Sequence, residues 1–184
     1  MMTSVFFTRS RETSQCPQCS GKLVSRDSRR RAFLEEDGTR NFLQIRRLVC
    51  LSCGALHSEL PDFIQPFKHY VSETIQKVID QEPHYCAAED STMYRWKREF
   101  RRFFGELDSA LISLWIRRCN RPWELLLGVS LLLEIRKEQH HNWYAFVNRL
   151  LINAGYGTYT QFAFCPSPVG ATLFSKPKRK GQPP

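Results

Sequence analysis

Apolar residues recur at intervals of three and four over much of the second half of the chain, which is the spacing of amphipathic helices. The first such run predicts a helix from Val71 to Asp80, with Ser72 as a suitable N-cap and Pro83 as its end. Three later runs predict further helices in the C-terminal half. Their apolar stripes are Leu107, Leu111, Leu114 and Trp115; Trp123, Leu126, Leu127, Leu131 and Ile135; and Trp143, Phe146, Val147 and Leu150, the last within a helix from Asn142 to Asn153.

The run from Asp90 to about Phe104 predicts the helix with the clearest division into two faces, beginning at Asp90 or Ser91 as N-cap. Its apolar stripe comprises Met93, Trp96, Phe100 and Phe103. The opposite face collects Ser91, Arg95, Arg98 and Arg102, with Arg101 and Tyr94 on its flank. Such an arginine face suits a DNA major groove, where arginines contact phosphates or guanine edges. An ordinary solvated face is the alternative.

The two helices on either side of Pro83 resemble a helix-turn-helix unit with an unusual connection. Asp80 and Asp90 are ten residues apart, whereas a tight helix-turn-helix has a turn of about three or four residues. We therefore expect either a short extra helix between Glu82 and Glu89 or a looser variant of the unit.

Strand-like patterns are concentrated between residues 16 and 69. Two arms, Lys22 to Phe33 and Arg40 to Val49, flank the segment Glu36-Asp37-Gly38-Thr39, whose Asp-Gly pair is a hairpin turn signal. Alternation in the second arm is imperfect, so a β-bulge is expected there. The region therefore predicts a β-hairpin with little core of its own.

Two Cys-x-x-Cys pairs bracket this hairpin. They are Cys16 and Cys19, then Cys50 and Cys53, and they are followed by Gly21 and Gly54. Short loops let both thiolates of a pair face one ion, and glycine is expected to let the backbone turn where other residues would be strained. Four thiolates match the tetrahedral preference of zinc and leave no open position, so we predict one structural Zn²⁺ and a zinc ribbon. The alternative of two redox dithiols is weakened because no βαβ pattern surrounds either pair.

Several residues near the cysteines need a separate interpretation. His57 follows Cys53 closely, and we expect it to have a non-ligand role because four cysteines complete the site. Arg46 or Arg47 is expected to offset the negative charge of the cluster, with a nucleic-acid contact as the alternative. The run Arg29-Arg30-Arg31 fits either a solvated edge of the ribbon or a phosphate contact. Cys86, Cys119 and Cys165 have no partners at metal spacing and are expected to be small buried or neutral residues.

Charge and composition limit the function further. The formal net charge is +9, from 27 basic and 18 acidic residues, which favours polyanionic partners. The most apolar stretch, Leu125 to Leu133, is far shorter than the roughly 20 residues of a membrane span, and the N-terminus lacks a secretion-signal pattern. We therefore expect a cytoplasmic protein without membrane contact. No phosphate-binding glycine loop, nucleophile elbow or His-Glu-x-x-His motif is present, so neither an enzymatic activity nor a small-molecule substrate is expected.

A set of short motifs resembles an uncharacterised bacterial family of small zinc-ribbon, helix-turn-helix proteins associated with transposases and mobile elements. The motifs are Cys16-Pro-x-Cys19, Arg47-x-x-Cys50-x-x-Cys53-Gly54, His57-x-x-Leu60-Pro61-Asp62, Pro66-Phe67-Lys68-x-Tyr70, Ser91-Thr92-x-x-Arg95-Trp96-Lys97, Asn153-Ala-Gly and Phe162-Ala-Phe. The resemblance implies DNA binding, with the four cysteines as the metal site and Ser91, Arg95 and Arg98 as DNA contacts.

These observations predict an α+β protein with a small N-terminal four-cysteine zinc ribbon, a helix-turn-helix-like region and C-terminal helices. The expected divisions are a flexible lead-in (1–15), the ribbon (16–69), the DNA-binding region (70–105), a helical region (106–165) and a disordered basic tail (166–184). The expected function is non-enzymatic, zinc-dependent binding of double-stranded DNA as a transposon accessory factor or transcriptional regulator, with a transposase as a candidate partner. The alternatives are an interaction module that docks on a transposase or polymerase, and RNA binding.

Overall fold

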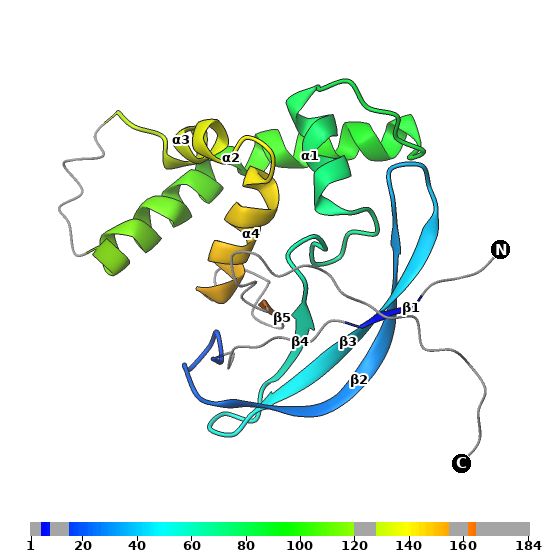
Figure 1. Ribbon diagram of the computed structural model, residues 1–184. Coiled ribbons are helices and arrows are strands. Elements are labelled where there is room, and N and C mark those ends of the chain that lie inside the picture. The colour runs from blue at the N-terminus through cyan, green and yellow to red at the C-terminus, as the bar shows by residue number, and fades with distance from the viewer. Residues whose placement is uncertain (1–4, 8–14, 120–127, 155–161, 165–184) are drawn as a thin grey trace, which may run out of the picture.

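A computed structural model describes residues 5–7, 15–119, 128–154 and 162–164. Within these ranges the chain combines a sheet from its N-terminal part with four later helices, which confirms the predicted α+β class (Figure 1). The elements in chain order are β1 (Val5–Phe7), β2 (Leu23–Leu34), β3 (Arg40–Cys50), β4 (Leu56–Leu60), α1 (Ser72–Asp80), α2 (Asp90–Cys119), α3 (Leu131–Glu138), α4 (Trp143–Asn153) and β5 (Phe162–Phe164).

The long hairpin of β2 and β3 is the centre of the sheet and confirms the two predicted arms. At its turn Gly38 adopts a φ of 84°, and the Thr39 amide donates to Asp37 Oδ1 at 2.8 Å, as the Asp-Gly signal predicted. The bulge was expected in the second arm but lies in the first, between Ser25 and Asp27. The extra residue there shifts the alternation of β2. Leu23 therefore packs beside Cys16 and Cys50, whereas Phe33 packs in the core that the hairpin shares with the helices.

Three short strands complete the sheet at the other edge of β3. β4 pairs antiparallel with the end of β3 that carries Cys50, and β1 pairs in parallel with Phe42–Gln44. β5 in turn pairs in parallel with β4. β1 lies in the predicted lead-in and β5 in the predicted helical region, so both expectations are corrected at these positions. Periodicity gave no signal for such short strands, whose pairing satisfies backbone groups at the edges of longer ones.

α1 begins one residue earlier than the predicted cap at Ser72 required. Val71, with extended backbone, is the N-cap, and Ser72 lies inside the helix. The Ser72 hydroxyl accepts from the Gln65 amide at 2.7 Å and donates to the Asp62 carbonyl, so it fastens the preceding loop instead of capping the helix. Residues 81–89 form a loop without helix, which agrees with the looser of the two expected connections.

α2 is one continuous helix from Asp90 to Cys119, where two separate stripes had been expected to mark two helices. Its buried stripe runs through Trp96, Leu111 and Leu114. Phe103 was predicted to belong to this stripe but is 39% exposed, whereas Phe104 packs edge-on against Phe100 with ring centroids 5.7 Å apart. Phe104 therefore packs against the helical core in the place that was predicted for Phe103.

The remaining helices agree with the predicted stripes where the structure describes them. Ser130 caps α3 by accepting from the Leu133 amide at 3.2 Å. Trp143 and Val147 of α4 are buried, as expected, while Phe146 and Leu150 are only partly buried. The predicted positions Trp123, Leu126 and Leu127 and the predicted tail lie outside the described residues.

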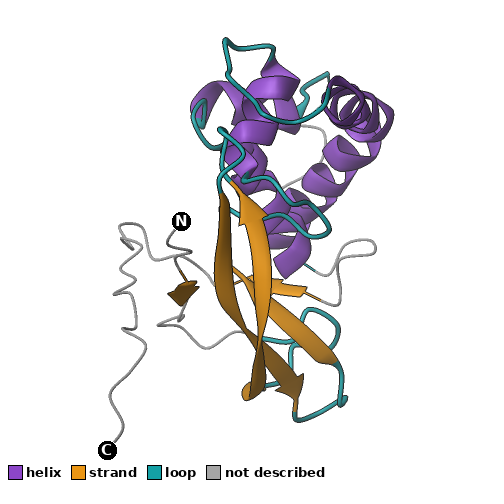
Figure 2. Ribbon diagram, turned by 90° about the vertical axis from the view of Figure 1, so that its right-hand side faces the viewer, coloured by secondary structure: helices purple, strands orange, loops and turns teal. Residues whose placement is uncertain are grey.

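Two apolar clusters join these elements into one body. The larger cluster packs α1 to α4 together around Val78, Trp96 and Trp143. The second joins Leu43 and Ile45 of β3 to loop and helix residues, which are Ile64, Val71 and Ile152. Figure 2 shows the helices gathered at one end of the long hairpin. The hairpin is therefore not an isolated module, because its middle shares a core with the helices.

Candidate metal centre and arginine face

The two cysteine pairs form matching loops at the end of the sheet opposite the turn between β2 and β3. Cys16 donates its amide to the Gly21 carbonyl at 2.9 Å, and Cys50 donates to the Ala55 carbonyl at 2.9 Å. In the reverse direction, the Ser20 and Gly54 amides donate to the carbonyls of Cys16 and Cys50 at 2.8 and 3.0 Å. Each loop thus carries the same pair of backbone hydrogen bonds, which presents its two sulfurs on one side.

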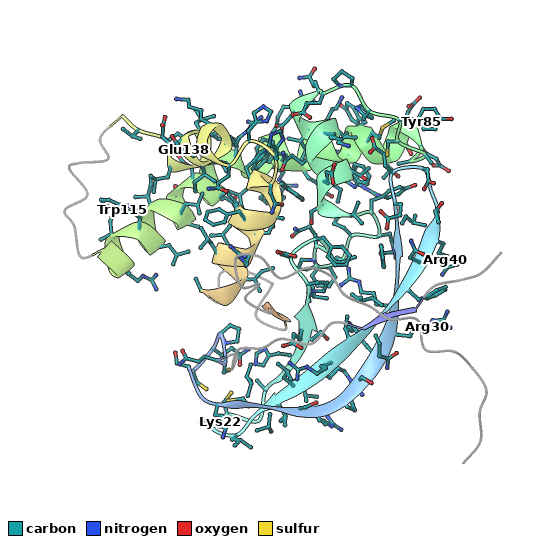
Figure 3. All side chains as sticks on the ribbon, viewed as in Figure 1. Lys22, Arg30, Arg40, Tyr85, Trp115 and Glu138 are labelled. Atoms are coloured by element: carbon teal, nitrogen blue, oxygen red, sulfur yellow. The ribbon has the colours of Figure 1, made fainter. Side chains whose placement is uncertain are left out.

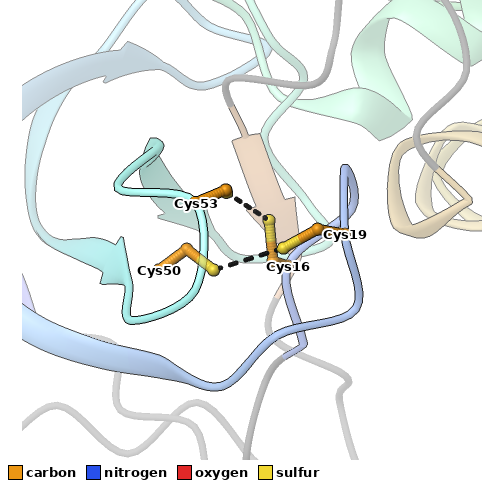
Figure 4. Close-up of side chains that lie close together, drawn as sticks. All are labelled: Cys16, Cys19, Cys50 and Cys53. Carbon is orange, nitrogen blue, oxygen red and sulfur yellow. Dashed lines mark hydrogen bonds between the residues drawn. The ribbon is translucent and has the colours of Figure 1, made fainter.

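The four sulfurs meet between the loops (Figure 4). All four Sγ atoms lie within 4.8 Å of one another. Cys16 and Cys53 approach to 3.7 Å, and Cys19 and Cys50 approach to 3.4 Å. A tetrahedral ion with metal–sulfur bonds of about 2.3 Å separates its ligand sulfurs by about 3.8 Å. The arrangement therefore fits a metal ion held by four cysteines, as the sequence predicted.

The two glycines after the cysteine pairs have different roles. Gly54 adopts a φ of 72°, so it makes the left-handed turn that was expected of both. In the first loop this turn is made by Ser20, with a φ of 58°. Gly21 is needed for space instead, because a Cβ there would lie 2.9 Å from the Cys50 sulfur and 2.5 Å from the Ser52 hydroxyl.

Burial and backbone amides give the four thiols unequal environments. Cys16 and Cys50 are buried, whereas Cys19 and Cys53 are exposed. The Cys53 amide is the main cause that lowers the pKa of the Cys50 thiol to about 6. The Gly21 amide lowers the pKa of Cys19, but hydrogen bonds with the Cys50 and Cys53 thiols outweigh it and raise that pKa to about 12. Thiols this close cannot all lose protons easily, and a bound cation removes that conflict.

His57 lies beside the sulfur cluster and is not one of its four members. Its side chain is 1% exposed, and its Nε2 lies 3.3 Å from the Cys16 sulfur. This position suits an N–H donor that stabilises a thiolate, which supports the predicted non-ligand role.

The arginines expected to offset the cluster's charge pair with carboxylates instead. Arg46 makes a two-pronged contact with the buried Glu59, at 2.6 and 2.8 Å. Arg47 makes a similar contact with Asp27. The sequence-based assignment of these arginines is therefore wrong, because strand pairing places acids opposite them.

The five residues proposed as DNA contacts share one exposed side of α2. Ser91, Arg95, Arg98, Arg101 and Arg102 are all exposed. Within the described part of the chain, none of these four arginines forms a salt bridge. The one acidic residue between Ser91 and Gly105, Glu99, is paired with Lys68. This pairing leaves the arginine charge uncompensated.

Arg31 and Lys68 have positioning roles that sequence reasoning missed. Arg31 donates to the carbonyls of Gln65 and Lys68, at 2.6 and 2.9 Å, and thereby fastens the loop after β4 to the hairpin. Lys68 of the same loop then reaches Glu99 of α2. Strand alternation separates Arg31 from Arg30 but leaves it on the same face as Arg29, and its carbonyl partners come from residues distant in sequence.

Comparison with known proteins identifies a family match over part of the chain. Residues 16–96 match a family described as a domain of unknown function (DUF6431). The matched segment begins at the first cysteine and ends at Trp96, so it covers the metal centre, the hairpin, α1 and the start of α2. No curated protein and no solved structure matches the chain. None of the described helices has the length and apolar character needed to cross a membrane.

Proposed function

We propose that this protein binds double-stranded DNA without catalysing a reaction, and that its four cysteines hold one structural Zn²⁺. The observation that carries the proposal is the exposed arginine face of α2, which no described carboxylate neutralises. Zinc is the ion that best suits a closed site of four thiolates. In this proposal the protein acts as a transcriptional regulator or as an accessory factor of a mobile element, with a transposase as partner.

The proposal fits the way α2 is held. Trp96 is buried and packs edge-on against Tyr70, with ring centroids 5.4 Å apart. Lys68 holds Glu99 at the side of the helix. These contacts fix the helix while Arg95, Arg98 and Arg102 stay in solvent, which a groove-reading helix requires.

Selection from a random duplex library, followed by polarisation titrations, tests this function. Affinity should fall steeply as salt rises, because phosphate contacts release counterions. Arg95→Ala and Arg98→Ala should each weaken binding by about 1–3 kcal/mol if they contact bases. Lys137→Ala, which removes an exposed charge from α3, serves as the control. If the purified, metal-loaded protein selects no sequence and binds no duplex at low salt, the proposal is wrong.

A second function is favoured by a different observation. A groove of about 480 Å³ lies between α2 and α4, lined mainly by apolar side chains that include Phe103, Leu107 and Val147. Such a groove suits an interaction module that docks on a transposase or polymerase. Capture of one protein after nuclease treatment, together with no duplex affinity, would favour it. RNA binding is separated from both by competition between duplex DNA and structured RNA.

A further inference from the structure

Arg30, Phe42 and Arg40 form a compact group on the outer face of the hairpin, which we call the Arg–Phe–Arg cluster. The Arg30 guanidinium carbon lies 3.5 Å from the centre of the Phe42 ring, and that of Arg40 lies 5.3 Å from it. The room for the ring comes from Ala32, the small residue directly opposite Phe42 on β2. One aromatic ring therefore orients two guanidinium groups.

The cluster faces away from the core. Leu43 and Ile45 of β3 point toward the helices and are fully buried. Because side chains alternate along a strand, Phe42 points to the opposite face of the sheet. Arg30 and Arg40 are exposed there. Nothing in the packing of the described core requires two arginines at these positions.

The charge of the cluster is uncompensated among the described residues. Other arginines of the hairpin have internal partners: Arg31 binds carbonyls, Arg46 binds Glu59 and Arg47 binds Asp27. No carboxylate in the described ranges forms a salt bridge with Arg30 or Arg40. Two like charges held beside one ring repel each other, and a bound anion would relieve that repulsion.

The cluster lies on the same side of the molecule as the start of α2. The hairpin turn packs on the loop before α2, where the Ala87 amide donates to the Glu36 carbonyl at 3.0 Å. Figure 3 shows Arg30, Arg40 and Tyr85 along this side. Segments 36–40 and 87–91 connect Arg40 and Ser91 to this hydrogen bond, so the reach of the chain keeps their Cα atoms within about 35 Å. This is close to one turn of duplex DNA, about 34 Å.

We propose that the Arg–Phe–Arg cluster is a second DNA contact, which clamps the phosphodiester backbone while α2 occupies the neighbouring groove. This inference rests on the proposed DNA-binding function and adds a contact surface outside α2. Arginine forks suit phosphate oxygens, and backbone contacts of this kind fix the orientation of a protein on the duplex. Single-stranded nucleic acid fits less well, because Arg30 covers the face of Phe42 on which a base would stack.

The test compares Arg30→Gln/Arg40→Gln with the charge-matched control Lys137→Gln/Arg149→Gln, whose residues lie on α3 and α4. All proteins are titrated with a fluorescent random-sequence duplex of more than two helical turns. The cluster variant should lose about tenfold in affinity, and its salt slope should fall by about 2, because each phosphate contact contributes about 0.9. Arg30→Lys/Arg40→Lys retains the charge and should recover most of the salt slope. Circular dichroism and zinc content should be unchanged.

The outcomes separate this inference from the function on which it rests. If the wild type binds duplex and the cluster variant behaves like the control, the cluster contact is refuted while DNA binding by α2 stands. If the wild type binds no duplex at low salt, both fail. A cluster variant that loses single-strand or RNA binding but keeps duplex binding would also overturn the assignment to a duplex backbone. Should the double variant fail to fold, the two single Gln variants must each show half of the change in salt slope.

Discussion

Gly21 and Gly54 follow the two cysteine pairs at closely similar positions, yet the chain uses them for different physical reasons. Gly54 supplies a left-handed backbone conformation, and nothing lies within 4 Å of a Cβ added there. Gly21 supplies space beside the Cys50 sulfur and the Ser52 side chain. A side chain at Gly21 would therefore clash with atoms at the metal site, whereas a side chain at Gly54 would strain the backbone.

Gly21→Ala should weaken metal binding by about tenfold or more, because the added methyl group pushes the two loops apart and displaces a ligand sulfur. Competition with a chromogenic chelator measures this affinity. Gly54→Ala is the comparison: it should destabilise the second loop by about 1–2 kcal/mol without crowding the sulfurs. Equal metal affinity for Gly21→Ala and the wild type would contradict the close approach seen here.

The four cysteines of the metal centre could be predicted because two Cys-x-x-Cys pairs are a recognisable metal-binding pattern in the sequence. The roles of single arginines could not. Arg31, Arg46 and Arg47 look alike in the sequence, but one binds carbonyls and the other two bind Glu59 and Asp27. These partners are set by strand register and by a bulge between Ser25 and Asp27, and hydrophobic alternation does not fix either one.

At the scale of elements, α2 determines how the helices and the proposed DNA contacts are arranged. It carries the arginine face in its first half and a buried stripe through Leu111 and Leu114 in its second. Gly105 stands where these halves meet, on the exposed side, and nothing lies within 4 Å of a Cβ added there. The helix continues through this glycine because packing on both sides outweighs its low helix propensity.

Gly105→Ala should raise the free energy of unfolding by about 1 kcal/mol, since alanine loses less backbone entropy on entering the helix. Urea denaturation followed by circular dichroism at 222 nm measures the change, and DNA affinity should not change. A destabilised variant would mean that α2 bends or breaks at residue 105.

Hydrophobic periodicity predicted the hairpin arms, α1 and α4 closely because each buries a continuous stripe. It predicted two helices where α2 continues through Gly105. The low helix propensity of glycine can be read from the sequence, but the packing that outweighs it cannot. Periodicity also missed β1 and β5, which are three residues each and too short to show alternation. Their pairing depends on where the edges of β3 and β4 lie in three dimensions.

At the scale of the whole molecule, Glu36 links the hairpin turn to the helical part. Its carboxylate accepts from Lys77 of α1 at 2.8 Å and from the Tyr85 amide at 3.2 Å. The hydrogen bond from Lys77 is the main cause that lowers the pKa of Glu36 below its ordinary value of 4.5. The link is therefore fully present above that value and is lost as the pH falls through the lowered pKa.

The wild type should lose more stability than Glu36→Gln as the pH is lowered from 6 to values below 4.5, the ordinary pKa of the group. Urea denaturation at a series of pH values measures both proteins. Other carboxylates with lowered pKa, such as Asp27 and Asp37, are common to the two and cancel in the difference. Parallel pH profiles would show that Glu36 does not couple the hairpin to the helices.

The position of the metal centre determines what its removal should do. The apolar residues that pack with it, Leu23 and Leu48 beside Cys16 and Cys50, form a cluster of their own. The cores that hold the helices and the middle of the hairpin are separate from this cluster. The metal should therefore stabilise the far end of the hairpin more than the mounting of α2, although small metal sites often control the folding of a whole domain.

Chelation should accordingly increase amide hydrogen exchange in residues 16–25 and 48–57, while α2 and α4 stay protected and the signal at 222 nm is largely kept. Cys19→Ser/Cys53→Ser, which alters the two exposed ligands, should reproduce this pattern without a chelator. The exposed arginines of α2 would then keep their geometry, so metal removal should reduce duplex affinity less than Arg95→Ala/Arg98→Ala does. Cooperative loss of helix on chelation would show that the two parts fold as one unit, and that the metal supports α2 through the shared core around Ile45.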